Sequence, residues 1–118
     1  LKVAEEPVAV LMDAQADNSN HEWTLKVDPE KKNYLKITYT PVDSDNYSFQ
    51  IEADGEVVFT QTMTKEEWPE DSYYIYPLPL RVTQGKTSLK IKTKSLDYEG
   101  YNYNLAEIAK IEALAATK

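Results

Sequence analysis

Three successive runs of alternating apolar and polar residues, between positions 34 and 63, constrain the fold more than any other feature of the chain. Leu35, Ile37 and Tyr39 alternate with polar residues in the first run, and the second and third runs cover 47–53 and 57–63. A period of two gives a β-strand one buried face and one wet face. Turn-forming residues separate the runs, so the stretch predicts three consecutive antiparallel strands in a meander.

The dipeptide Asp54-Gly55, between the second and third runs, is a strong signal for a tight hairpin turn. A two-residue loop would leave Phe59 beside the polar face, and a one-residue change of register moves every side chain to the other face. Burial therefore favours a three-residue loop, Asp54 to Glu56. This loop predicts three pairs, namely Ala53 with Val57, Ile51 with Phe59, and Tyr47 with Met63.

Further strands are predicted on both sides of this stretch. Their positions are Val8 to Met12, a well-covered first strand; Trp23 to Val27; Ser72 to Tyr76; and a strand through Leu89 and Ile91. Polar loops are expected at Asp13 to Asn20 and Thr64 to Asp71. The last segment, 105–117, has apolar residues at every third position, which favours a helix, whereas a sandwich needs a closing strand. We predict a strand over Ala106 to Ala113, perturbed by a bulge, with the helix as the alternative.

About eight short strands separated by turns indicate an all-β fold, an antiparallel β-sandwich with jelly-roll topology. An immunoglobulin-like sandwich is the alternative topology. The length of 118 residues fits one domain, 1–118. Because the chain begins with Leu1 rather than Met, we expect a domain excised from a larger protein.

Composition narrows the classes of partner. The net charge of −7 argues against nucleic acid and against anionic membrane surfaces, since both require a basic face. No segment approaches the roughly 20 apolar residues that span a bilayer, which argues against membrane insertion. The chain has no cysteine and a single histidine, His21, beside Glu22 in a polar segment. The usual nucleophile and base combinations are therefore missing, and we predict that the chain is not an enzyme.

The aromatic residues give the best candidate site. Nine tyrosines and two tryptophans stand against two phenylalanines, and side chains with an apolar body and a polar tip suit a surface that stays wet and still grips a ligand. Sugar rings stack on Tyr and Trp, and their hydroxyls bind amides and carboxylates. The run 97–104 has this composition, with Trp68 as a second wall. The predicted carbohydrate-binding residues are Trp68, Tyr98, Tyr101, Asn102, Tyr103 and Asn104.

An oxygen-rich group near the N-terminus is the candidate metal site. Asp13, Asp17 and Asn18 offer the oxygen ligands that calcium takes. The spacing is not that of an EF-hand, and a solvated polar loop remains the alternative. No other cofactor is predicted.

Four ordered motifs resemble the C-terminal galactose-binding-like β-sandwich accessory domain of β-L-arabinofuranosidase-type glycoside hydrolases. The motifs are Tyr34-Leu35-x-Ile37-x-Tyr39, Phe49-x-Ile51-x-Ala53-Asp54-Gly55, Tyr76-x-Leu78-Pro79, and Gly85-Lys86 followed by Leu89-x-Ile91-x-Thr93. The resemblance covers roughly Tyr34 to Thr93, although Thr93 stands where the family pattern tends to have an aromatic residue. In addition, Asn104-Leu105-x-x-Ile108 is similar to the closing strand of carbohydrate-binding modules, where the asparagine can touch sugar.

The family resemblance implies a jelly roll in a secreted, periplasmic or cell-surface glycan-degrading protein, with catalysis in a separate domain. Two functions are then open. The first is a non-catalytic accessory domain that binds carbohydrate through the loop 98–104. The second is a structural or interaction module whose tyrosines pack on a neighbouring domain or subunit, without a ligand.

Overall fold

The computed structural model describes residues 9–16, 21–39, 46–64, 73–95, 97–98, 101–102 and 108–117, and for 46–47, 63–64, 97–98 and 101–102 we describe the backbone alone. The described segments form ten strands and one helical turn. They are β1 (Ala9–Ala16), β2 (Glu22–Lys26), β3 (Asn33–Tyr39), β4 (Asn46–Ala53), β5 (Glu56–Thr64), β6 (Tyr73–Pro77), α1 (Leu80–Thr83), β7 (Ser88–Ser95), β8 (Asp97–Tyr98), β9 (Tyr101–Asn102) and β10 (Ile108–Ala116).

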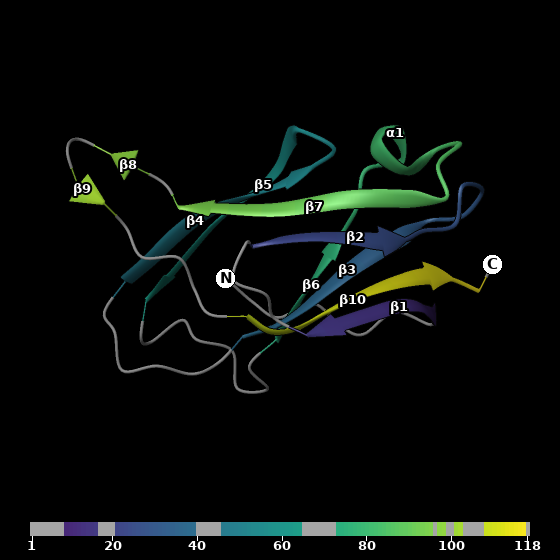
Figure 1. The fold of residues 1–118 in the computed structure, drawn as a ribbon, viewed down its shortest axis with the longest axis horizontal. Helices are drawn as coiled ribbons and strands as arrows, with labels where there is room; N and C mark the ends of the chain where they lie inside the picture. The colour runs from purple at the N-terminus through teal and green to yellow at the C-terminus, as the bar shows by residue number, and fades with distance from the viewer. Residues whose placement is uncertain are drawn as a thin grey trace.

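Eight of these strands form two antiparallel four-stranded sheets that pack face to face (Figure 1). Sheet A has the order β1-β10-β3-β6 and sheet B the order β2-β7-β4-β5. Four of the antiparallel pairs are nested: β4 with β5, β3 with β6, β2 with β7, and β1 with β10. A long hairpin rolled up on itself gives this order, so the predicted β-sandwich with jelly-roll topology is confirmed.

The predicted meander is wrong at its first connection. β3 belongs to sheet A and β4 to sheet B, so the two strands face each other across the core instead of pairing. The ring of Tyr39 on β3 lies 5.9 Å from the ring of Phe49 on β4, centroid to centroid. Alternation identifies the buried face of a strand but does not identify its partner. The six residues 40–45 are enough to cross the roughly 10 Å between packed sheets.

The hairpin of β4 and β5 combines a tight turn with a bulge. Asp54 (φ 49°) and Gly55 (φ 87°) both have positive φ, as a two-residue type I′ turn requires. The register then shifts by one residue at Val58, after which Ile51 pairs with Phe59. The predicted three-residue loop is therefore wrong, and so is the predicted pair of Ala53 with Val57, because Ala53 pairs with Glu56. The predicted pairs of Ile51 with Phe59 and Tyr47 with Met63 are confirmed. The bulge places Phe59 on the buried face without lengthening the loop.

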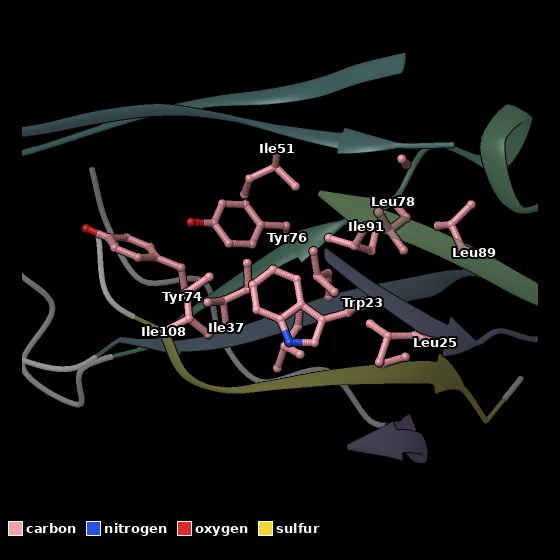
Figure 2. Packing of buried hydrophobic residues seen from close by; sticks show 14 of the residues in the cluster. Trp23, Leu25, Ile37, Ile51, Tyr74, Tyr76, Leu78, Leu89, Ile91 and Ile108 are labelled. Atoms are coloured by element: carbon pink, nitrogen blue, oxygen red, sulfur yellow. The ribbon is translucent and has the colours of Figure 1, made fainter. Parts of the chain in front are cut away.

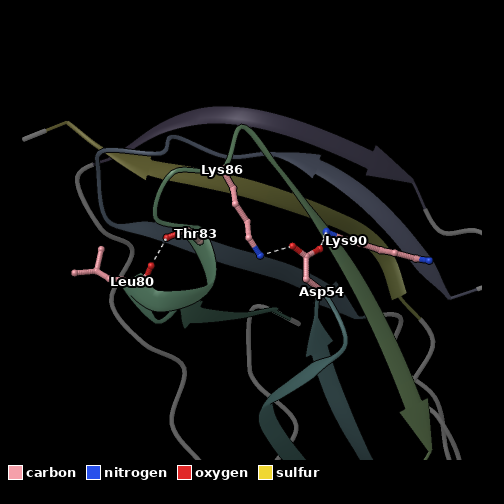
Figure 3. Close-up of polar contacts among 5 residues, drawn as sticks. All are labelled: Asp54, Leu80, Thr83, Lys86 and Lys90. Carbon is pink, nitrogen blue, oxygen red and sulfur yellow. Dashed lines mark hydrogen bonds and ion pairs between the residues drawn. The ribbon is translucent and has the colours of Figure 1, made fainter.

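Asp54 ties this turn to the neighbouring strand β7. Its carboxylate accepts hydrogen bonds from Lys86 Nζ at 2.5 Å and from the Lys90 backbone N–H at 2.9 Å (Figure 3). Its own N–H donates to the Lys90 carbonyl at 2.8 Å. The hydrogen bond from Lys86 is the main reason that the pKa of Asp54 is lowered. The single helical turn α1, which the sequence pattern did not indicate, precedes Lys86 and buries Val82 in the core.

The core lies between the two sheets and takes its side chains from both (Figure 2). Its largest fully buried members are Trp23, Leu25, Leu35, Ile37, Tyr39, Phe49, Ile51, Leu78, Leu89, Ile91 and Ile108. Figure 2 shows Trp23 and Tyr76 lying in the space between the layers, beside Ile37 and Ile91. The core therefore contains one of the two tryptophans and part of the tyrosine excess.

The first and last strands differ in how well they match the predictions from sequence. β10 is a strand over Ile108–Ala116 with a register shift beside Ala109, so the predicted bulged strand is confirmed and the helix alternative is wrong. β1 continues to Ala16, so the loop predicted from Asp13 begins too early. β1 is also an edge strand whose Val10 and Leu11 are exposed, which contradicts the expectation of a well-covered first strand.

Replacing the central ring of Phe49 tests the packing. Phe49 is fully buried, so we expect Phe49→Ala to lower the free energy of unfolding by about 3–5 kcal/mol through lost burial and a residual cavity. Denaturant unfolding measures this loss. Ser88→Ala, at the exposed start of strand β7, is the control and should stay within about 0.5 kcal/mol of the parent. A loss near the control value for Phe49→Ala would contradict the core.

The turn gives a prediction about pH. Because folding lowers the pKa of Asp54, its charged form stabilises the fold above the unfolded-state pKa of about 3.9. That contribution is lost as the pH falls through the lowered pKa. We expect Asp54→Asn, which keeps the positive φ and the Lys90 contact, to cost about 0.5–1 kcal/mol at neutral pH. Unfolding curves should show this difference shrinking as the pH falls below the unfolded-state pKa. Glu30→Gln, which removes an exposed carboxylate from the turn between β2 and β3, is the control variant.

Candidate functional site at the loop end of the sandwich

Four connections leave the sandwich at one end, which we call the loop end. They are 17–21, 40–45, 65–72 and 96–107, and the strands that flank them end side by side (Figure 1). In sheet A, Ala16 pairs with Lys110 and Ile108 with Tyr39. The Trp23 indole N–H on β2 donates to the Ala16 carbonyl on β1 at 3.2 Å. This hydrogen bond joins the end of β1 in sheet A to the start of β2 in sheet B.

A small hairpin lies within the last of these connections. β8 and β9 pair with Asp97 opposite Asn102 and Tyr98 opposite Tyr101. Figure 1 shows this hairpin beyond the end of β7, on the side of the molecule where the other three connections begin and end. The backbone therefore brings two of the predicted tyrosines to directly opposed positions of one ribbon.

The predicted site residues fall into three groups. Tyr98, Tyr101 and Asn102 belong to the β8–β9 hairpin. Asp13 lies in β1. The others lie outside the described residues, and they are Trp68, Tyr103, Asn104, Asp17 and Asn18. The carbohydrate site thus remains a prediction, located at the loop end by its strands.

Charge is divided unevenly between the loop end and the rest of the chain. The four connections contain ten of the 20 Asp and Glu residues but one of the 13 Lys and Arg residues. Their formal charge is −9, whereas that of the whole chain is −7. The remainder of the chain therefore carries a small net positive charge, and the acidity indicated by the sequence belongs to the connections of the loop end.

Asp13 lies in β1, where its carboxylate binds backbone groups. Oδ1 accepts the Ala14 N–H at 2.9 Å and Oδ2 accepts the Lys26 N–H at 3.1 Å. The neighbouring Gln15 donates from Nε2 to the Thr24 carbonyl at 2.7 Å. These side chains join the edge of sheet A to the edge of sheet B. Within the described ranges, no three His, Asp or Glu side chains gather to hold a metal ion, and a calcium site with Asp17 and Asn18 stays a prediction.

His21 and Thr93 form a polar pair that the sequence did not indicate. His21 has a positive φ of 54°, and its carbonyl accepts the Thr93 N–H at 3.1 Å. Among the described residues, His21 Nδ1 and Thr93 Oγ1 are buried atoms without a hydrogen-bond partner. His21 is half-buried rather than a surface residue. The sequence pattern is consistent with this partial burial, because His21, Trp23 and Leu25 occupy alternate positions leading into a buried strand.

Three tyrosines inside the sandwich have a structural role. The Tyr76 hydroxyl donates to Gln61 Oε1 at 2.8 Å and lies 2.7 Å from the Tyr39 hydroxyl. The rings of Tyr39 and Tyr74 pack edge to face, 6.2 Å apart. Burial raises the pKa of both Tyr39 and Tyr76, so both hydroxyls stay protonated and act as hydrogen-bonding groups. Part of the tyrosine excess thus belongs to the core and not to a binding surface.

Comparison with protein-family models, with curated proteins and with solved structures finds no match. In the part of the chain that the structure describes, no helix is long and apolar enough to cross a membrane.

The link between the sheet edges can be tested at Asp13. We expect Asp13→Ala to lower the free energy of unfolding by about 0.5–1.5 kcal/mol in the presence of a chelator, because the exposed Lys26 N–H exchanges its carboxylate acceptor for water. If Asp13 also binds calcium, millimolar calcium should raise the melting temperature of the parent and leave that of the variant unchanged. Equal melting temperatures of the parent with and without calcium would contradict the metal site and leave the structural role intact.

Proposed function

We propose that the chain is a non-catalytic accessory domain of a larger secreted, glycan-degrading protein, and that it binds carbohydrate at the loop end. The observation that carries this proposal is the β8–β9 hairpin, which opposes Tyr98 and Tyr101 at the end of a sandwich. Binding residues are commonly carried by loops that a rigid scaffold holds in place. The two packed sheets are such a scaffold.

The chemistry of the segment fits a sugar. Tyrosine offers a flat apolar ring with a hydroxyl at its tip, and sugars offer C–H faces and hydroxyls. The opposed pair Asp97 and Asn102 adds a carboxylate and an amide next to the tyrosines. Such side chains accept and donate hydrogen bonds to hydroxyl groups.

The charge of the loop end narrows the class of glycan. A formal charge of −9 in the four connections repels uronates and sulfated sugars. Neutral chains, such as those rich in arabinose, galactose or xylose, do not meet this barrier. We therefore expect the ligand to be a neutral oligosaccharide or polysaccharide.

The resemblance to the accessory domain of β-L-arabinofuranosidase-type glycoside hydrolases supports the class of parent protein. Its motif residues lie at core-facing positions of the strands, as Ile37, Ile51 and Ile91 do. The motif residues Asp54-Gly55 and Gly85-Lys86 instead form turns between the strands. The motifs are therefore residues of the scaffold. In such a parent, catalysis belongs to a separate domain.

A second candidate is an interaction module that packs on a neighbouring domain. It is favoured by Val10 and Leu11 of edge strand β1, which are 47% and 57% exposed. Leu11 is paired with Leu114 of β10, which is itself buried, so the apolar exposure at this edge belongs to β1. An exposed apolar group of this kind is typical of a contact surface when it is large and continuous.

Binding to a glycan panel tests the first candidate. We expect neutral polysaccharides to bind more tightly than monosaccharides, because a small open site contacts few atoms of a single sugar. Tyr101→Ala and Tyr103→Ala should each weaken binding by about tenfold, the equivalent of about 1.4 kcal/mol. Calorimetry and affinity electrophoresis measure this.

Leu11→Ala is the matched control, because it truncates an exposed apolar side chain outside the loop end and should leave glycan affinity unchanged. For polyuronates and sulfated glycans we expect no binding signal above that of the buffer control. Two outcomes would contradict the proposal: no binding by any neutral glycan near millimolar concentration, or unchanged binding by both tyrosine variants. Either outcome would favour the interaction module.

A further inference from the structure

The four edge strands of the sandwich differ in how they are protected from pairing. β1 carries a bulge at Met12 and turns Asp13 toward sheet B. On β2, side chains of β1 occupy two backbone groups of the edge: Gln15 binds the Thr24 carbonyl and Asp13 binds the Lys26 N–H. β6 has five residues and ends at Pro77. A bulge, an occupied edge and a short strand with proline are all features that prevent a further strand from adding.

β5, the outer strand of sheet B, has none of these protections along most of its length. It has nine residues, and from Val57 to Thr64 it contains no charge and no proline. Its bulge at Val58 lies beside the turn, and the six residues 59–64 are regularly paired with β4. No described strand pairs with its other side. Long, regular, uncharged edges are templates for another β-strand.

The outer face of sheet B carries fewer charged side chains toward the β5 edge. β2 and β7 present charged side chains there: Glu22, Lys26, Lys90, Lys92 and Lys94. β5 presents Thr60 and Thr62, which are exposed, and Thr62 exchanges a hydrogen bond with Ser48 of β4 at 3.0 Å. Interface centres are depleted of charge relative to the rest of the surface. β4 carries Glu52 near the turn, but from Val57 onward the outer strand β5 adds no charged residue to this face.

We propose that β5 pairs antiparallel with β5 of a second copy of this chain, so that the two B sheets become one continuous sheet across a two-fold axis. An isologous contact needs a surface that complements itself. A strand without charges meets this condition, because no like charges face each other in the pair. A charged partner strand would gain no ion pair from β5.

The pleat of the strand restricts the register. Core-facing Gln61 and the exposed Thr60 and Thr62 alternate, so a pairing that keeps the two cores on one side must be centred on a residue. Centring on Gln61 places Thr60 of each chain opposite Thr62 of the other. Cross-strand threonine pairs stabilise antiparallel sheets through their hydroxyls and methyl groups. The pairing buries little besides the strand edges, which predicts a weak, concentration-dependent dimer.

Sedimentation of the parent chain from low micromolar to near-millimolar concentration is the first measurement, and we expect a monomer–dimer equilibrium. Two double variants test the surface: Thr60→Lys with Thr62→Lys, and Thr60→Glu with Thr62→Glu. Each should raise the dissociation constant by about tenfold or more, since like charges opposite each other destabilise a strand pair. An equimolar mixture of the two should recover dimer formation at low salt. Thr24→Lys, on the exposed face of β2, is the matched control and should dimerise as the parent does.

Hydrogen exchange locates the contact. The proposal predicts that the backbone amides of 59–64 exchange more slowly as the protein concentration rises, and that circular dichroism and melting show all variants folded. A parent that stays monomeric over the whole range would overturn the proposal. So would a dimer that both double variants form as readily as the parent, a mixture that fails to recover, or protection that appears on β1 instead of β5. Glycan binding is measured separately, so failure of either proposal leaves the other in place.

Discussion

The turn at Asp54-Gly55, where two successive residues have positive φ, lies at the centre of the nested strand pairs of this sandwich. β4 pairs with β5 across the turn, and the other pairs enclose that pair in nested order. Asp54 holds the turn against β7 through backbone bonds on both sides of Lys90, one from its own N–H and one to its carboxylate. Because β4 also pairs with β7, the register set at the turn is carried into the middle of sheet B.

The two sides of the sandwich are closed by different means. On one side, Asp13 and Gln15 bind the backbone of β2, so side chains supply the hydrogen bonds that a further strand would supply. On the other side, Gln61 of β5 accepts the Tyr76 hydroxyl of β6, and Phe59 packs on the Tyr76 ring at 4.9 Å. Backbone groups are satisfied in the first case, whereas in the second the contact is between side chains and leaves the strand edge unpaired among the described strands.

Alternation in the sequence predicted the strands and the buried faces well, because burial of one face is a local property of each segment. Ile37, Ile51 and Ile91 are all buried as their patterns indicate. The partner of each strand was harder to infer, and the expected meander failed because the crossing at 40–45 leaves no mark in the pattern. The hairpin loop was wrong since a bulge and a longer loop produce the same pairing of Ile51 with Phe59. For the site, composition pointed to the aromatic segment 97–104. The contacts of Asp13 and His21 could not be inferred in the same way, because they depend on strands distant in the chain.

The four connections carry a formal charge of −9 and the rest of the chain a small net positive charge, a division that would give the molecule an electric dipole. A dipole experiences a torque in the field of a charged surface, so the molecule would turn as it diffuses toward one. Near an anionic cell wall or membrane the loop end would face away, and near a cationic surface it would arrive first. Salt screens the field of the surface beyond a Debye length of about 8 Å at physiological salt, so this orientation acts only close to the surface. A domain tethered beside an anionic surface would therefore present its loops to the surrounding solution.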